Sequence, residues 1–286
     1  MISIIVPAFN EEREIPFLLE SIKEQSFKKD YEIIVADNNS SDRTVEVAKK
    51  YGCRISPGGS PAKARNKGAL EAKGNLFLFV DADTVLPYDF LENSVGEFEK
   101  RNLDVAAFFL LPRSKNVFLK IAFNLFYNVF PALISEKFVP HATNTILVKK
   151  SLHEKLGGFD ESIIVAEDHF YAREGGKIGR FGLIRSSNIF VSTRRFKEEG
   201  LFATYLKYVL METYTFLLGP IKTDVFNYKL VHYNHPKKTS FLGKFFDSFA
   251  RILKEFLSFI GILISLPIVV FVFLLTIFLK ILKLKA

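Results

Sequence analysis

Asn75-Leu-Phe-Leu-Phe-Val-Asp-Ala-Asp-Thr-Val-Leu-Pro87 joins a short apolar run to two carboxylates one residue apart. An unbroken apolar run between a glycine and a polar turn is typical of a strand covered on both faces, as in a parallel sheet. Ligands of such sheets bind at the carboxyl ends of the strands, where Asp81 and Asp83 fall. The stretch therefore predicts either an oxygen-ligand site for Mg or Mn carrying a diphosphate, or an ordinary turn stabilised by aspartate side chains.

Two strand–helix units precede that stretch. Residues 2–6 and 31–36 are expected strands, and each is followed by a polar turn and an expected helix. Strand, helix, strand, helix in this order predicts a parallel sheet with right-handed crossovers. The second turn begins with Asp37, which this topology puts on the same edge of the sheet as Asp81 and Asp83.

A cationic segment and a second acidic pair follow along the chain. Lys63, Arg65 and Lys67 lie at the expected start of a helix, where the helix dipole favours anions and arginine can hold phosphate with two hydrogen bonds. This pattern fits a diphosphate, and a solvated basic helix face is the alternative. Glu167 and Asp168 are adjacent. They form ordinary surface ion pairs or include a general base.

The composition indicates a globular domain joined to a very apolar segment. Hydrophobic residues make up 49% of the 286 positions, and the net charge is +8. Such a charge fits nucleic acid, membrane lipid or an anionic substrate. Because many C-terminal lysines and arginines flank an apolar run, anionic lipid is favoured, and the sequence carries no nucleic-acid-binding signature. The single cysteine, Cys53, excludes an intramolecular disulfide and a cysteine-rich metal site.

Two apolar segments bear on membrane contact. Residues 256–279 carry no formal charge, and a helix of that length, about 36 Å at ~1.5 Å per residue, can cross a ~30 Å hydrocarbon core. A single span is expected, with an in-plane or buried helix as the alternative. Residues 117–134 predict an apolar helix or lid, for which core packing is favoured over membrane-surface contact. The N-terminus lacks signal-peptide features, so we expect a membrane-attached protein whose bulk is cytoplasmic.

Six short motifs occur in an order that is typical of one family. They are Ser3-Ile-Ile-Val-Pro-Ala-Phe-Asn-Glu11, Asp37-Asn-Asn-Ser-Ser-Asp42, Ala64-Arg-Asn-Lys-Gly68, Asp81-Ala-Asp83, Gly157-Gly-Phe-Asp160 and Glu167-Asp168. Together they resemble the family 2 glycosyltransferases with the GT-A nucleotide-diphospho-sugar transferase fold, over residues 2–200. The resemblance implies an α/β fold with a Rossmann-like, mostly parallel sheet flanked by helices, to which the C-terminal membrane helix is added.

The resemblance also implies a role for each matching residue. The donor-binding residues would be Pro7, Ala8, Phe9, Glu11, Asp37, Arg65 and Asp81. Asp83 would hold Mn or Mg on the diphosphate, and Asp168 would deprotonate the acceptor hydroxyl. Gly158 and Glu167 would lie on the acceptor side. Arg194 and Arg195 look like the motif that closes over the diphosphate, although Thr193-Arg-Arg-Phe196 differs from the Gln-x-x-Arg-Trp of processive synthases.

These expectations divide the chain into three parts and favour one activity. Residues 1–220 would be the catalytic domain, residues 221–255 a linker with an amphipathic membrane-surface helix, and residues 256–280 a transmembrane or anchoring helix. The activity would be an inverting, metal-dependent transfer from a nucleotide-diphospho-sugar to an acceptor hydroxyl at the cytosolic membrane face. The acceptor is open, and a lipid-linked or isoprenoid-linked one fits the anchor.

Two other functions remain as alternatives. A sugar nucleotidyltransferase would carry a glycine-rich turn with a basic residue after the first strand, and Pro7-Ala-Phe-Asn-Glu11 stands there instead. A membrane-tethered nucleotide-sugar binding protein without catalysis would not need Asp37, Asp81, Asp83 and Asp168 together.

Overall fold

The computed structural model describes most of the first 200 residues. The described residues are 1–129, 132, 135, 139–200, 204, 208, 211, 214–215 and 219–222. The chain divides into two compact units, Met1–Thr193 and Arg194–Ala286. The membrane helix predicted at 256–280, and nearly all of the linker predicted at 221–255, lie outside the described residues. Within the described part of the chain, no helix is both long and apolar enough to span a bilayer.

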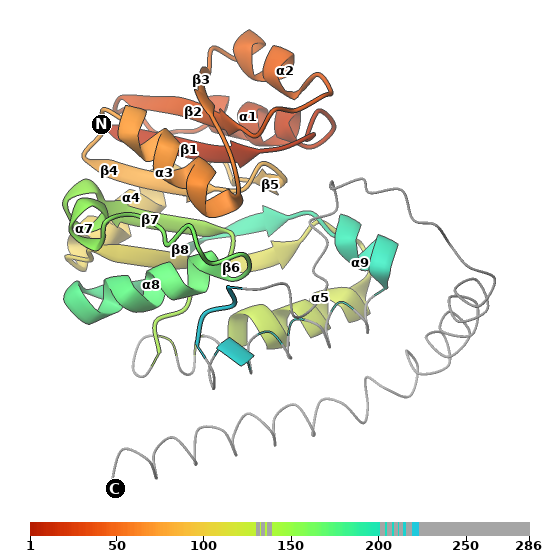
Figure 1. Cartoon of the computed structure of the whole chain (residues 1–286). Helices are drawn as coiled ribbons and strands as arrows, with labels where there is room; N and C mark the ends of the chain where they lie inside the picture. The colour runs from red at the N-terminus through yellow and green to blue at the C-terminus, as the bar shows by residue number, and fades with distance from the viewer. Residues whose placement is uncertain are drawn as a thin grey trace, which may run out of the picture. The chain divides into compact units, whose positions relative to one another are not determined.

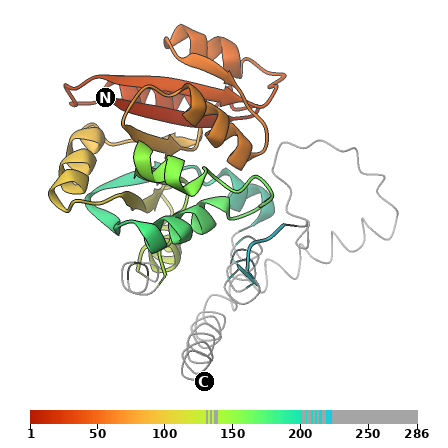
Figure 2. The same ribbon diagram turned by 60° about the vertical axis from the view of Figure 1, so that its left-hand side comes forward.

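One eight-stranded sheet organises the first unit, in the order β3-β2-β1-β4-β7-β6-β8-β5 (Figure 1). The strands are β1 (Ile2–Ala8), β2 (Tyr31–Asp37), β3 (Arg54–Pro57), β4 (Leu76–Val80), β5 (Thr84–Val85), β6 (Val105–Pro112), β7 (Thr145–Lys149) and β8 (Phe181–Val191). Figure 2 shows the two halves of this sheet side by side, the red and orange N-terminal strands next to the yellow and green later ones.

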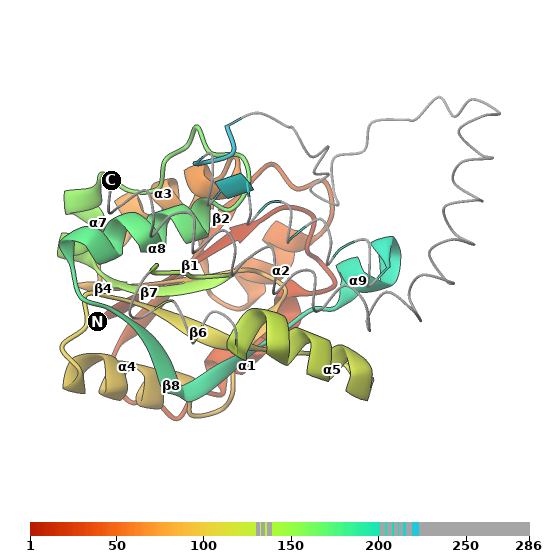
Figure 3. The ribbon, with the colours of Figure 1, turned by 90° about the horizontal axis from the view of Figure 1, so that it is seen from below.

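Helices cover both faces of this sheet. They are α1 (Ile15–Lys23), α2 (Thr44–Lys50), α3 (Pro61–Glu71), α4 (Phe90–Lys100), α5 (Val117–Asn124) with the π-helix η1 (Leu125–Val129), α7 (Lys150–Leu156) and α8 (Glu167–Ile178). In Figure 3, α3, α7 and α8 lie on one face, and α1, α4 and α5 lie on the other. The continuous apolar run of β4 is explained by this arrangement, because a strand covered on both faces has no side for water.

The direction of the strands differs between the two halves. The first three β-strands and β4 pair in parallel, as the strand–helix pattern predicts. Beyond β4 the sheet is mixed: β7 runs antiparallel to both β4 and β6, β5 is antiparallel to β8, and β6 is parallel to β8. The sheet is therefore mostly parallel, as predicted, and the two reversed strands, β7 and β5, are what the prediction did not include. An apolar run in the sequence indicates that a strand is buried, but it does not indicate in which direction the strand runs. That direction depends on how each connection returns to the sheet.

An aromatic cluster fills the layer between the sheet and helices α7 and α8. Phe79 of β4 packs edge-on against Phe159, and Phe159 stacks on Tyr171 with ring centroids 3.9 Å apart. His153 lies among these rings, 7% exposed, with its Nδ1 2.8 Å from the Tyr171 hydroxyl. Burial lowers the pKa of His153 to about 4, so this imidazole is a neutral part of the core.

Stability should fall when the pH is lowered from 6.5 towards 4. The ordinary histidine pKa is about 6.5, so in this interval the unfolded chain takes up a proton at His153 that the folded core excludes. The full contribution is present above pH 6.5, and about 2 to 3 kcal/mol is lost near pH 4. Urea unfolding followed by circular dichroism at both pH values measures this loss.

His153→Gln is the matched variant, since glutamine still offers an oxygen to the Tyr171 hydroxyl but does not titrate. Its pH dependence should be shallower than that of the unchanged protein. An identical slope in both proteins would show that His153 does not cause the effect.

Candidate active site

The carboxyl ends of the parallel strands meet at one edge of the sheet. In the register of β1, β2 and β3, Ala8 stands opposite Asp37, and Asp37 stands opposite Pro57. On the other side of β1, Ile5 pairs with Phe79, so the end of β4 reaches the same edge. The turns that follow Ala8, Asp37 and β4 are thereby neighbours, as expected from the topology. Pro7 and Ala8 are the last two residues of β1.

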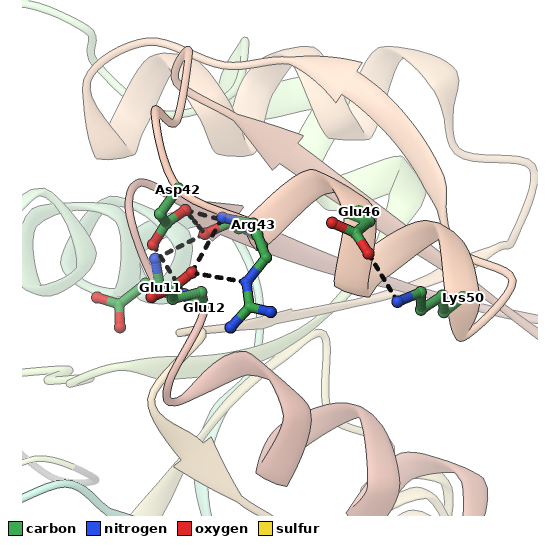
Figure 4. Close-up of polar contacts among 7 residues, drawn as sticks. Glu11, Glu12, Asp42, Arg43, Glu46 and Lys50 are labelled. Atoms are coloured by element: carbon green, nitrogen blue, oxygen red, sulfur yellow. Dashed lines mark hydrogen bonds and ion pairs between the residues drawn. The ribbon is translucent and has the colours of Figure 1, made fainter.

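The turns after β1 and β2 are joined by hydrogen bonds. The backbone N–H of Glu11 donates to Thr44 Oγ1 at 2.8 Å, and that of Glu12 donates to Asp42 Oδ2 at 3.0 Å. Glu12 in turn accepts from the Arg43 side chain (Figure 4). Burial alone would raise the pKa of Asp42, but hydrogen bonds from Thr44 and Glu12 outweigh it and hold that pKa below its usual value. The predicted donor residues Phe9 and Glu11 therefore stand in a turn that is braced by the turn after β2 and the start of α2.

Asp37 is held in its own turn. Its carboxylate accepts a hydrogen bond from the Ser40 N–H at 3.0 Å, and its carbonyl accepts one from Gly58 at 2.7 Å. A Cβ at Gly58 would stand 2.5 Å from the carbonyl carbon of Asp37, so only glycine lets the loop after β3 approach this closely. The carboxylate thus stabilises local structure, and its contact with a nucleotide base stays a prediction.

Arg65 forms the centre of the site. It lies on α3 with 3% exposure, and its Nη2 donates to Asp81 Oδ1 at 2.7 Å. Its Nη1 donates to Glu167 Oε1 at the start of α8. One guanidinium therefore connects α3, the end of β4 and the start of α8. Arg65 acts first as a positioning residue, and its predicted contact with the donor is not tested by this geometry.

Among the described residues that shift the pKa of Asp81, carboxylates outnumber cations. Burial raises the pKa of Asp81 to about 7; Arg65 opposes this, and the carboxylates of Asp83, Asp168 and Glu167 reinforce it. Burial by itself would lower the pKa of Arg65. The negative charges of Asp81, Glu167 and Asp168 outweigh burial and hold that pKa above its usual value. The Asp81 side chain keeps 30% exposure, so the surplus negative charge is open to an arriving cation.

This surplus of hard oxygen ligands fits Mg or Mn better than a soft metal. Asp83, half-buried, stands in the short segment between β4 and β5, and its carbonyl accepts a hydrogen bond from Ser192 at 3.2 Å. Among the described residues, no group of three or more His, Cys, Asp and Glu side chains is arranged to hold a metal ion. Asp83 would therefore need oxygens from a bound diphosphate to complete a metal shell.

Asp168 is anchored across the sheet edge. Its Oδ2 accepts a hydrogen bond from the Asn144 N–H at 3.0 Å, and its Oδ1 accepts from the N–H of His169 at 2.9 Å. Asn144 immediately precedes β7, whose first residue pairs with Val80 at the end of β4. The residue before this acidic pair, Ala166, has a φ of 61°. A side chain in this left-handed region costs about 1 kcal/mol or more, so packing holds the start of α8 in place.

Three residues beside Asp168 carry no sequence motif. The rings of His141 and His169 lie with centroids 4.1 Å apart, and Thr143 Oγ1 is 3.3 Å from His169 Nε2. His169 Nε2 is 3.7 Å from Asp168 Oδ1. The segment that holds His141 and Thr143 is distant from Asp168 in sequence and reaches it only because β7 is antiparallel to β4. A polar Thr-Asn pair directly before a strand was the one available signal.

Gly158 has a structural reason for being glycine. Its φ is +84°, and a Cβ there would stand 2.6 Å from Asn66 Oδ1. Asn66, next to Arg65 on α3, donates through Nδ2 to the Phe159 carbonyl at 2.9 Å and accepts from the Phe159 N–H at 2.7 Å. The asparagine thereby fastens the loop before α8 to the helix that carries Arg65. The acceptor-side role of Gly158 stays a prediction.

Arg194 and Arg195 begin α9 (Arg194–Glu199), in the second unit. Within that unit, Arg195 Nη1 donates to the Tyr208 hydroxyl at 2.7 Å. The role of both arginines on a diphosphate stays a prediction.

Part of this chain also matches a known family. Residues 3–156 match the family model described as Glycosyl transferase family 2. The chain belongs to this family. The match covers the turns after β1 and β2, Arg65 and the Asp81-Ala-Asp83 segment, and it ends before Gly158 and the Glu167-Asp168 pair.

Curated relatives share part of this family region. Poly(ribitol-phosphate) beta-N-acetylglucosaminyltransferase TarS of Staphylococcus aureus is 32% identical over 112 residues, which are 36% of this chain and 20% of that protein. Dolichyl-phosphate beta-glucosyltransferase ALG5D of Trichomonas vaginalis is 33% identical over 119 residues, which are 35% of this chain and 36% of that protein. The matched part is thus well under half of either relative's length.

Solved structures share the fold. Mannosyltransferase PcManGT from Pyrobaculum calidifontis, in complex with GDP-Man and Mn²⁺, superposes with a TM-score of 0.57 at 22% identity, covering 76% of this chain and 70% of that one. At this identity the likeness concerns the fold alone. It confirms the predicted α/β class, with a mixed sheet and flanking helices.

Replacing Arg65 by methionine should lower the free energy of unfolding by ~3 to 5 kcal/mol, because Asp81 and Glu167 would lose their shared cation inside the protein. Lys63→Met is the control, since Lys63 is an exposed cation on the same helix and its loss should cost under about 0.5 kcal/mol. Urea unfolding of the two variants measures both. Equal losses would contradict a central structural role for Arg65.

Proposed function

We propose that this chain is an inverting glycosyltransferase that moves a sugar from a nucleotide-diphospho-sugar to an acceptor hydroxyl. The observation that carries the proposal is the Arg65 ion-pair centre, which joins the carboxylates at the end of β4 to the helix that presents Asp168. Membership of glycosyl transferase family 2 supports it independently. A sugar donor and an acceptor hydroxyl need these two groups of carboxylates close together, one for the diphosphate and one for the proton.

The donor side of the site would stabilise the leaving group. When the bond between the anomeric carbon and the diphosphate oxygen breaks, negative charge develops on the diphosphate. A divalent cation held by Asp83 and the diphosphate would supply the neutralising charge. The braced turns after β1 and β2 orient the nucleotide with little reorganisation, because Glu11 and Asp37 stand in turns that the chain already holds in place.

The acceptor side would remove a proton. As the acceptor oxygen attacks the anomeric carbon from the face opposite the leaving group, its proton passes to a carboxylate oxygen of Asp168. The N–H groups of Asn144 and His169 aim that carboxylate. A positioned base of this kind contributes ~10² to 10⁴-fold to the rate. A single displacement inverts the anomeric centre.

A membrane location and a lipid-linked acceptor complete the proposal. The uncharged run at residues 256–279 is long enough for a membrane helix. One relative is named for dolichyl phosphate. We infer that the transfer takes place at the cytosolic face of a membrane, with the acceptor carried by a lipid or isoprenoid. The nucleotidyltransferase and the non-catalytic binding protein are the functions that the following experiments would favour if transfer fails.

Donor binding should raise the melting temperature in a metal-dependent way. UDP, GDP and CMP are each added with and without Mn²⁺. One of these nucleotides should stabilise the folded protein more when the metal is present, because only the folded site binds the nucleotide and the metal together. Asp83→Asn should remove the metal-dependent part and keep the fold. If no nucleotide shifts the melting temperature, the donor site is wrongly assigned.

Asp168→Asn should retain donor binding and lower the transfer rate by ~10² to 10⁴-fold, since the amide keeps one oxygen for the Asn144 N–H but cannot accept the proton. The assay measures the rate at which radiolabelled sugar passes to native membranes from a nucleotide sugar that carries the nucleotide found to bind. Glu174→Gln, on the same helix, is the control and should leave the rate unchanged. Full activity of Asp168→Asn would remove Asp168 as the base.

A further inference from the structure

An apolar stripe faces solvent on α5 and η1. Val117, Ile121, Leu125 and Val129 recur every four residues and are 63%, 54%, 38% and 42% exposed. Together these four residues are called the α5 stripe. At helical spacing they occupy one side of the element, the side directed away from the sheet. Isolated exposed aliphatic residues are ordinary, whereas a continuous row of four marks an interaction surface.

The helix that carries this stripe is firmly seated. On its opposite side Leu119 and Phe123 are buried. Asn128 is also buried; its Oδ1 accepts from the Leu110 N–H, and its Nδ2 donates to the Leu110 carbonyl, both at 2.8 Å. This pair of hydrogen bonds fixes the rotation of the element against β6. The exposure of the α5 stripe is thus a property of a docked helix.

Charge and sequence indicate what the α5 stripe meets. Lys115 precedes α5, Lys120 stands beside Ile121, and both are exposed. An apolar row bordered by lysines is the pattern of a helix that lies in the surface of a bilayer with anionic lipid. The same chain carries the uncharged run at residues 256–279, which a bilayer would accommodate.

An open hollow lies beside the stripe. It measures about 260 Å³ and is lined by Phe109, Leu111, Val129 and Ala132 together with asparagine side chains. Val129 belongs to the stripe as well. A second hollow, of only about 10 Å³, shares Phe109 and Asn128 with the first and is also lined by His141 and Thr143, the neighbours of His169. Residues beside the stripe and residues near Asp168 thus line neighbouring hollows, and the second hollow has room for no more than a water-sized molecule.

We propose that the α5 stripe is the surface by which the first unit docks on a bilayer containing anionic lipid. Docking there places the 260 Å³ hollow at the lipid surface. The docking deepens the membrane location in the proposed function and does not depend on the transfer reaction itself.

A single introduced thiol can report on the docking. The native Cys53 is 8% exposed, and burial raises its pKa to about 11, so it reacts slowly with thiol reagents. Ile121→Cys in the full chain is labelled with an environment-sensitive fluorophore and reconstituted with phosphatidylcholine vesicles, with and without phosphatidylglycerol. Leu70→Cys on α3 is the matched control, since Leu70 is 86% exposed and lies outside the stripe.

Lipids with a quencher on the acyl chain should quench the label at Ile121 several-fold more than the label at Leu70, and more strongly when phosphatidylglycerol is present. Adding Leu125→Glu should abolish the difference, whereas Leu70→Glu should not. Equal quenching at both positions overturns the proposal. A label at Ile121 that is shielded from water before lipid is added also overturns the proposal. If this shielding rises with protein concentration, a second copy of the chain covers the stripe. If it stays constant, another part of the same chain covers the stripe.

The quenching needs neither donor nor turnover, so the two proposals fail separately. Loss of the nucleotide-dependent shift in melting temperature with quenching intact counts against the proposed function alone. Normal shifts with equal quenching at Ile121 and Leu70 count against the docking alone.

Discussion

The buried guanidinium of Arg65 is the interaction on which the site depends. It joins Asp81, at the end of β4, to Glu167, at the start of α8, although these residues are far apart in the chain. Removing one partner of a buried ion pair leaves an uncompensated charge, so the three elements keep their arrangement together or lose it together. Because Arg65 is buried and fixed, it also holds the carboxylates of the site close enough to act on one another. These are Asp81, Asp83, Glu167 and Asp168.

That arrangement gives the site a surplus of negative charge and a strained backbone. Asp81 has a pKa raised by burial and by three nearby carboxylates, and Ala166 enters α8 through a left-handed conformation. Both features cost stability in the absence of ligand. The surplus of carboxylates is also a reason to expect that a divalent cation binds, because the cation would relieve the repulsion between them. Asn66 and Asn144 offset part of this cost through backbone hydrogen bonds on either side of the site.

The reversal of strand direction after β4 sets the rest of the geometry. Because β7 runs antiparallel to β4, the segment before β7 arrives at the same edge as the Asp81-Ala-Asp83 turn. This brings Asn144, Thr143 and His141 to Asp168. Helix α5 lies on the face of the sheet opposite α8 (Figure 3). There Asn128 bonds to Leu110 of β6, and the α5 stripe remains exposed to solvent.

The sequence by itself determined the parallel first half of the sheet and the edge shared by Asp37, Asp81 and Asp83, because alternating strand and helix patterns imply these features locally. Only the tertiary structure decided that Arg65 is a buried partner of Asp81 and Glu167, that the later strands are mixed in direction, and that α5 is half-buried with its apolar row exposed. Apolar composition reports the amount of burial. Which side of a helix is covered, and which charges meet, depends on contacts between residues distant in the chain.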